Sequence, residues 1–220
     1  MAQDTGRIRH ELQGQVRGME RMPAEGWAAV EIQNVPGVGL MSANGRFFVL
    51  NATIVDVWSG KKLETMEDIR EAAGHLNLAQ LGLKVSDLAP ISFGTGERRV
   101  TVFADPLCPP CLELWSKLPE LANDYVFDIL LVPMNGNGER LVRTYACAAD
   151  RQAVVTAVLA GTREPGLREG MGCDMASVQK RLIATEMLGI RDVPTLIADD
   201  GRVMRGLNKP LGPWLAGTPR

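Results

Sequence analysis

In the second half of the chain, segments with the apolar pattern of a strand are followed by segments with the apolar spacing of a helix. Short apolar runs rich in β-branched residues predict strands over 100–104, 125–132 and 193–198, and a further strand over 202–205 after a tight Asp200-Gly201 turn. Apolar residues at helical spacing predict helices after Cys108, over 138–149, 150–160 and 174–188, and between Pro210 and Pro213. This order of strands and helices predicts a mixed α/β sandwich.

The first 60 residues predict one helix and a small antiparallel sheet. Ile8, Leu12, Val16 and Met19 recur at helical spacing, which predicts an amphipathic helix within residues 4–20. Strands are predicted over 27–33, 38–42, 46–50 and 53–58, and Asn44-Gly45 favours a hairpin between two of them. A unit of this size buries little apolar surface by itself. We therefore expect its exposed strand edge either to pair with a second copy of the chain or to pack on the rest of its own chain.

A helix is predicted over residues 65–82 between these two parts. Thr65 and Asp68 resemble a capping box, and Gly82 can end the helix. The stretch 86–96 is loop-rich and marks a boundary. A lone helix with a thin apolar stripe suggests a spacer.

Composition narrows the class of protein without fixing the function. The chain has 220 residues, of which 45% are hydrophobic and 23% charged, enough for one large or two small domains. A net charge of −2 implies no nucleic-acid or anionic-membrane surface. No apolar run reaches membrane-spanning length, and polar sequence follows Met1 directly, so the chain carries no recognisable signal peptide.

The chemistry centres on a C-x-x-C motif, Cys108-Pro109-Pro110-Cys111, placed where a strand turns into a helix. Free backbone N–H groups and the helix dipole stabilise an anion there, which favours the thiolate needed for disulfide exchange. Cys111 lies one turn further on, within reach of Cys108. We therefore assign Cys108 as the attacking cysteine and Cys111 as the more buried, resolving one.

Two other interpretations of the motif are a static disulfide and half of a zinc site. A tetrahedral zinc site needs a second close pair of ligands, and Cys147, Cys173, His10 and His75 supply none in the sequence. We expect no metal and no cofactor. Asp105 either forms the turn before the helix or tunes Cys108 by its charge, and turn formation is favoured. Pro194 opens a late strand, where a proline is tolerated.

The motif Phe103-x-Asp105-x-x-Cys108-x-x-Cys111, followed by Val193-Pro194-Thr195 and Asp200-Gly201-Arg202-Val203, resembles the thioredoxin-fold domain of the DsbC/DsbG family of periplasmic disulfide isomerases. Asn44-Gly45-Arg46-Phe47-Phe48 is similar to that family's small dimerisation domain, and residues 65–82 to its linker helix.

This resemblance implies an α+β protein with three parts. These are a cystatin-like dimerisation domain over 1–62, a linker helix over 63–88, and a thioredoxin-like catalytic domain with a helical insertion over 89–220. It also implies a homodimer joined through the first domain. Pro194 matches the family's cis-proline, and Val193, Pro194 and Thr195 are expected to hold substrate backbone. Cys147 and Cys173 match a second, structural disulfide.

The resemblance further implies thiol–disulfide exchange on misfolded secreted proteins in the periplasm, with a membrane thiol reductant as partner and no nucleic acid. Pro109-Pro110 and Val193 depart from the usual isomerases and tune redox poise in this fold. A thiol oxidase or reductase of the same fold, and a dimeric chaperone that binds unfolded clients, are therefore alternatives. A cysteine protease is disfavoured because no histidine follows Cys108 in its domain.

Overall fold

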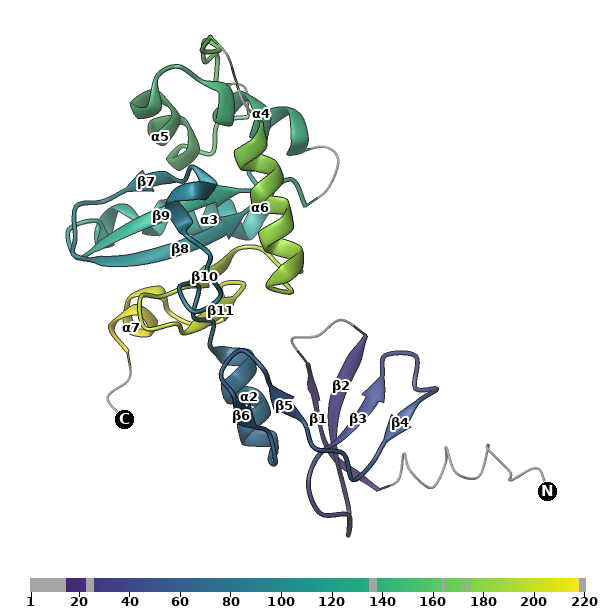
Figure 1. The fold of residues 1–220 in the computed structure, drawn as a ribbon. Helices are drawn as coiled ribbons and strands as arrows, with labels where there is room; N and C mark the ends of the chain where they lie inside the picture. The colour runs from purple at the N-terminus through teal and green to yellow at the C-terminus, as the bar shows by residue number, and fades with distance from the viewer. Residues whose placement is uncertain are drawn as a thin grey trace. The chain divides into compact units, whose positions relative to one another are not determined.

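The computed structural model describes residues 15–22, 26–134, 138–163, 165–171, 173 and 175–217 (Figure 1). The chain divides into two compact units, one that ends at His75 and one that begins at Leu76. In the described residues, no helix is long and apolar enough to cross a membrane.

The first unit is built on a four-stranded antiparallel sheet. Its strands run in the order β1-β2-β3-β4: β1 (Val16–Arg21), β2 (Trp27–Ile32), β3 (Gly39–Ser42) and β4 (Phe48–Val49). The predicted Asn44-Gly45 hairpin between β3 and β4 is confirmed, and Gly45 takes the positive φ of 66° that such a turn needs. A second hairpin pairs β5 (Val55–Asp56) with β6 (Lys61–Lys62), so the strand predicted over 53–58 is shorter.

The predicted helix over 4–20 is wrong where the structure describes it. Val16 and Met19 lie in β1, and its residues alternate between half-buried and exposed, which is the period of a strand. Residues 4–14, with Ile8 and Leu12, lie outside the described residues. Pairing with β2 outweighs the weak helical spacing, because glycine at position 18 makes a helix there costly.

Helix α2 (Met66–Gly74) begins as predicted and ends earlier. The Thr65 side chain accepts from the Asp68 N–H while the Asp68 carboxylate accepts from the Thr65 N–H, which confirms the capping box. His75 leaves the helix in an extended conformation. The next leucines, Leu76, Leu78, Leu81 and Leu83, pack in the core of the second unit, which explains why the helix does not continue to residue 82.

The second unit holds a five-stranded sheet in the order β11-β10-β8-β9-β7. Among the described strands of this sheet, β8 and β9 alone pair in parallel. The strands are β7 (Ile91–Phe93), β8 (Arg98–Ala104), β9 (Tyr125–Leu131), β10 (Thr195–Ile197) and β11 (Val203–Arg205). The stretch 86–96 is therefore not only loop, because it holds β7 and follows the short 3-10 helix η1 (Val85–Leu88). Three residues of strand are too few to show a sequence period.

Helices cover both faces of this sheet. They are α3 (Pro109–Lys117), the 3-10 helix η2 (Pro119–Leu121), α4 (Glu139–Cys147), α5 (Arg151–Leu159), α6 (Ala176–Met187) and α7 (Leu211–Ala216). The predicted helices α3 to α6 are confirmed, α7 continues past the predicted end at Pro213, and η2 was not predicted. Alternation along β8 sends Val102 to a core shared with Leu114 and Trp115 of α3, and Phe103 to a core shared with Ala184 on α6. The sheet therefore lies between α3 and α6.

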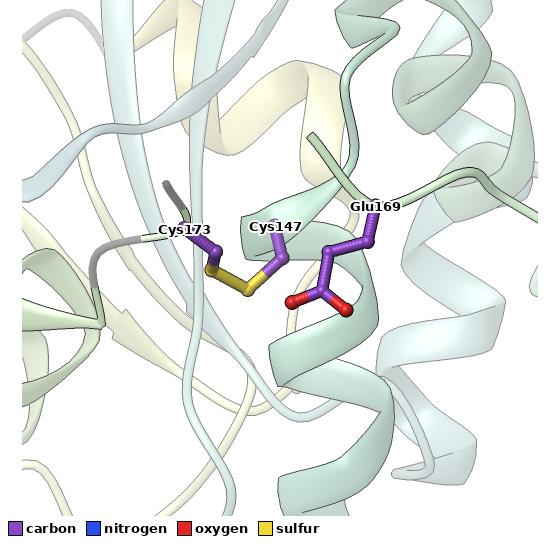
Figure 2. Close-up of side chains that lie close together, drawn as sticks. All are labelled: Cys147, Glu169 and Cys173. Carbon is purple, nitrogen blue, oxygen red and sulfur yellow. A yellow bond between two sulfur atoms is a disulfide. The ribbon is translucent and has the colours of Figure 1, made fainter. Parts of the chain in front are cut away.

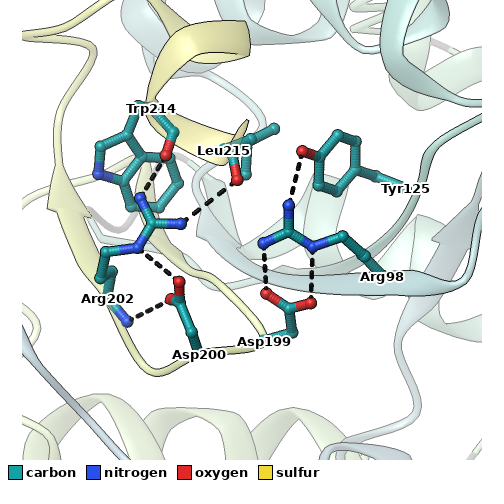
Figure 3. A network of polar contacts seen from close by, with 7 residues as sticks. All are labelled: Arg98, Tyr125, Asp199, Asp200, Arg202, Trp214 and Leu215. Atoms are coloured by element: carbon teal, nitrogen blue, oxygen red, sulfur yellow. Dashed lines mark hydrogen bonds and ion pairs between the residues drawn. The ribbon is translucent and has the colours of Figure 1, made fainter. Parts of the chain in front are cut away.

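Two arginines hold the turn between β10 and β11, one from β8 and the other bonded to α7 (Figure 3). Arg98 on β8 makes two bonds to the Asp199 carboxylate and one to the Tyr125 hydroxyl. Arg202 pairs with Asp200 and donates to the carbonyl oxygens of Trp214 and Leu215 at the end of α7. The Asp200-Gly201 turn is thereby held to both its own sheet and the last helix.

Candidate active site

The two cysteines of the C-x-x-C motif lie at the N-terminus of α3 and are both free thiols. Cys108 is the N-cap residue, and Pro109 and Pro110 occupy the first two helical positions. Proline fits there because the missing N–H would have no partner inside the helix. The Cys111 N–H donates to the Cys108 carbonyl oxygen at 3.0 Å, so the two residues close the first turn.

The two thiols have different surroundings. Cys108 is half-buried, whereas Cys111 is fully buried on the face of α3 that packs against the sheet. Burial raises the pKa of the Cys111 thiol well above its usual range, and contact with Cys108 raises it further. Cys111 therefore stays protonated at neutral pH while Cys108 remains reachable from solvent.

The loop before β10 faces Cys108. The Cys108 thiol donates to the Val193 carbonyl oxygen at 3.3 Å, and the Val193–Pro194 peptide bond is cis. The Thr195 side chain is buried and donates to the Asp192 carbonyl oxygen, so it shapes this loop from inside. The structure thus brings together residues 85 positions apart in the sequence.

Asp105 forms the turn that precedes Cys108. Its carboxylate accepts from the Leu107 N–H at 2.7 Å, and its carbonyl oxygen accepts from the Cys108 N–H. Turn formation, the favoured expectation, is present. The carboxylate also accepts from the Met134 N–H, a long-range contact that nothing in the local sequence signals.

Cys147 and Cys173 form a disulfide, with Glu169 beside it (Figure 2). Their carboxylate and sulfur atoms make the one close group of three candidate metal ligands in the described residues. The two sulfurs are bonded to each other, however, and the Glu169 carboxylate pairs with Arg143 at 3.0 Å. This cluster is therefore a structural disulfide that ties the segment after α5 to the end of α4. Closing the loop between the two cysteines stabilises the folded chain by roughly 3–4 kcal/mol on a chain-entropy estimate.

A mixed sheet, a dithiol at a helix N-terminus and a cis-proline against the first thiol define a thioredoxin-like class of protein. The thioredoxin-like domain family matches residues 92–210, more than half of the chain, and the chain belongs to that family.

Two relatives narrow the class. The chain is 26% identical over 117 residues to the "Probable thiol:disulfide interchange protein DsbC" of Bordetella avium (strain 197N), a match that covers 53% of this chain and 41% of that protein. It is also similar to the crystal structure of a disulfide interchange protein from Neisseria gonorrhoeae, with a TM-score of 0.50, 25% identity, and coverage of 61% of this chain and 94% of that one. These matches confirm the resemblance to the DsbC/DsbG family and the α+β fold with a thioredoxin-like domain.

Proposed function

We propose that the chain is an enzyme of thiol–disulfide exchange that isomerises wrong disulfides in misfolded secreted proteins. The observation that carries this proposal is the asymmetry of the dithiol. Cys108 is half-buried at a helix N-terminus, and Cys111 is buried behind it with a raised pKa. In such a pair, the accessible thiol can attack a substrate disulfide, and the buried thiol can later attack the mixed disulfide.

The reaction begins when Cys108 loses its proton and its thiolate attacks one sulfur of a substrate disulfide. The Cys108–substrate S–S bond forms, the substrate S–S bond breaks, and the second substrate cysteine leaves as a thiolate. That thiolate can attack another substrate disulfide, and the rearranged substrate finally displaces Cys108. No net oxidation or reduction occurs along this route.

When the substrate in the mixed disulfide does not rearrange, Cys111 resolves that mixed disulfide. It gives up its proton and attacks the Cys108 sulfur, which closes the Cys108–Cys111 disulfide and releases the substrate with one disulfide reduced. The enzyme is then oxidised by two electrons and needs a dithiol reductant to return to its active form. The membrane thiol reductant implied by the resemblance would supply those electrons in the periplasm.

Substrate backbone would lie along Val193, Pro194 and Thr195. The Val193 carbonyl oxygen already accepts from the Cys108 thiol, so a chain bound at this loop would place a sulfur next to Cys108. Thr195 is buried as a whole residue and is paired in the sheet with Phe103 and Arg205, so its contribution would be to hold the loop that carries Val193 and Pro194.

Self-association through the first unit is part of the same proposal. Strand β4 is an edge of the first sheet, and Phe47 beside it is 55% exposed. Val49, Leu50 and Val57 are further exposed apolar residues of this unit. An exposed apolar edge strand invites a partner strand, and a second copy would bring two dithiols to one substrate.

The test is reactivation of a scrambled, fully oxidised multi-disulfide substrate by the reduced full-length chain. We expect reactivation in substoichiometric amounts, and at least about a hundredfold loss in Cys108→Ser because the attacking sulfur is gone. A Cys147→Ala/Cys173→Ala variant, which removes the other two sulfurs, should retain activity and serves as the control.

Two results would overturn the isomerase assignment. Rapid oxidation of a reduced substrate by the oxidised protein, without reactivation of the scrambled one, would identify a thiol oxidase. Suppression of aggregation that Cys108→Ser leaves intact, without reactivation by the wild type, would identify a chaperone.

A further inference from the structure

The Cys147–Cys173 disulfide lies against a short segment that contains Glu169. An isolated antiparallel bridge joins Glu169 to Ala148, the residue after the first cysteine. In the same bridge, the Gly170 N–H donates to the Cys147 carbonyl oxygen at 2.8 Å. These contacts hold the backbone on both sides of the Glu169 side chain next to the disulfide.

The Glu169 side chain points from this segment toward the two sulfurs (Figure 2). One of its carboxylate oxygens lies within 4.8 Å of the sulfur of Cys147 and of the sulfur of Cys173. Arg143 on α4 donates to the carboxylate at 3.0 Å, which keeps it in this position. A negative charge is therefore held beside both sulfurs of the bond.

Burial alone does not shield this disulfide from reagents in solvent. Cys147 is 6% exposed, and its sulfur lies 3.8 Å from the Met175 sulfur. Cys173 is only half-buried. A thiol can therefore approach the bond from the side of Cys173, where the fold leaves part of the residue open.

Reduction of the disulfide by a thiol places negative charge on its sulfurs. The thiolate bonds to one sulfur, the Cys147–Cys173 bond breaks, and the other cysteine leaves as a thiolate. A second thiolate then displaces the first, so two electrons pass to the cysteines and the reagent ends as its own disulfide. Because the Glu169 carboxylate lies near both sulfurs, it opposes this charge whichever sulfur is attacked.

We propose that Glu169 is a specificity-determining residue, which excludes the chain's own Cys147–Cys173 disulfide from thiol–disulfide exchange. The inference rests on the proposed function, in which the working enzyme is a reduced dithiol that meets other copies and a dithiol reductant. Each of these thiols can attack an unprotected disulfide and release the segment after α5 from the end of α4. The carboxylate slows that side reaction.

The test follows reduction of this one disulfide in a Cys108→Ser/Cys111→Ser background, where Cys147 and Cys173 are the chain's only cysteines. Thiols released by 2-mercaptoethanol are alkylated and counted by mass spectrometry. We expect Glu169→Gln to raise the rate constant about fivefold, the effect of two unit charges about 5 Å apart in water. Salt at about 1 M should remove most of this difference by screening.

Arg143→Gln is the matched variant, because it breaks the same ion pair but leaves the carboxylate in place without its counter-charge. We expect this variant to slow reduction by about two- to fivefold, opposite in sign to Glu169→Gln. Glu186→Gln, at the other end of α6 where Glu186 pairs with Arg191, should leave the rate unchanged. Faster reduction in both Glu169→Gln and Arg143→Gln would show that the pair only holds the segment, and would overturn the proposal. An unchanged rate in Glu169→Gln would overturn it as well.

The charge of the attacking thiol provides a second readout. At equal thiolate concentration, the acceleration in Glu169→Gln should be largest with mercaptoacetate, which carries an additional negative charge. It should be smallest with cysteamine, which carries a positive charge. A segment that is merely loosened admits every small thiol alike, so equal acceleration with mercaptoacetate, 2-mercaptoethanol and cysteamine would contradict the electrostatic role of Glu169.

These rates are measured without a protein substrate and without the dithiol of the active site, so they do not depend on isomerase activity. If the wild-type chain fails to reactivate scrambled substrate, the proposed function fails while the effect of Glu169 on Cys147–Cys173 can still be measured. If the wild type reactivates the substrate and Glu169→Gln leaves the reduction rate unchanged, the role of Glu169 alone is refuted.

Discussion

Arg181 is a fully buried guanidinium that bonds to backbone carbonyl oxygens. It donates to the carbonyl oxygens of Leu88, the last residue of η1, at 2.7 Å, of Ala89 just after it at 2.6 Å, and of Leu131 at the end of β9 at 3.2 Å. Burial, with a smaller contribution from the charge of Arg151, lowers the pKa of Arg181 to about 10. One side chain on α6 therefore satisfies three carbonyl groups that the fold withdraws from water.

We expect Arg181→Met to destabilise the second unit by about 2–3 kcal/mol, because methionine fills the space but leaves those carbonyl oxygens without donors. Urea unfolding would measure the change. Lys180→Met on the same helix is the control, since Lys180 is exposed and should change stability by less than about 0.5 kcal/mol. Equal stability of the two variants would show that desolvation of the Arg181 charge cancels its hydrogen bonds.

The position of a residue could be predicted where its neighbours in sequence determine it. Contacts between residues far apart in the sequence could not be predicted. The place of Cys108 at a helix start follows from an apolar run, a proline and the helical spacing that comes after them. The hydrogen bonds of Asp105 with Met134, and of Arg181 with Leu88 and Leu131, join segments that no sequence period connects. The assignments of Val193, Pro194 and Thr195 came from the resemblance alone.

Helices and strands with long apolar runs or clear caps were predicted at the correct positions. Strands β8 and β9 and helices α4, α5 and α6 lie where the sequence placed them, since each has a strong period of its own. Strand β1 and the end of α2 were misplaced because tertiary contacts outweigh local preference there: β1 pairs with β2, and Leu76 joins another core. Strand β7 was missed because it is short and finds its place only by pairing with β9.

For the complete chain, we propose that two copies associate through the first unit. Lysine at an edge strand blocks pairing with another strand. We expect Val49→Lys to shift the chain from dimer to monomer in sedimentation experiments, and to lower reactivation of scrambled substrate while the exchange chemistry of Cys108 persists.

Met171→Lys is the matched control for this change. Met171 is also an exposed apolar residue, but it belongs to the second unit, so this variant should remain dimeric. A wild-type chain that is monomeric, or a Val49→Lys variant that sediments as a dimer, would rule out this edge as the interface.

The proposed function requires that Cys108 attacks a substrate disulfide and that Cys111 releases the product. Its most direct test is to mix the Cys111→Ser variant with a scrambled substrate, quench with acid and look for a covalent adduct by non-reducing electrophoresis and mass spectrometry. We expect a mixed disulfide at Cys108 that accumulates far above the wild-type level and disappears with a reductant. No adduct, or an adduct that persists when Cys108 is also replaced by serine, would contradict the assignment of Cys108 as the nucleophile.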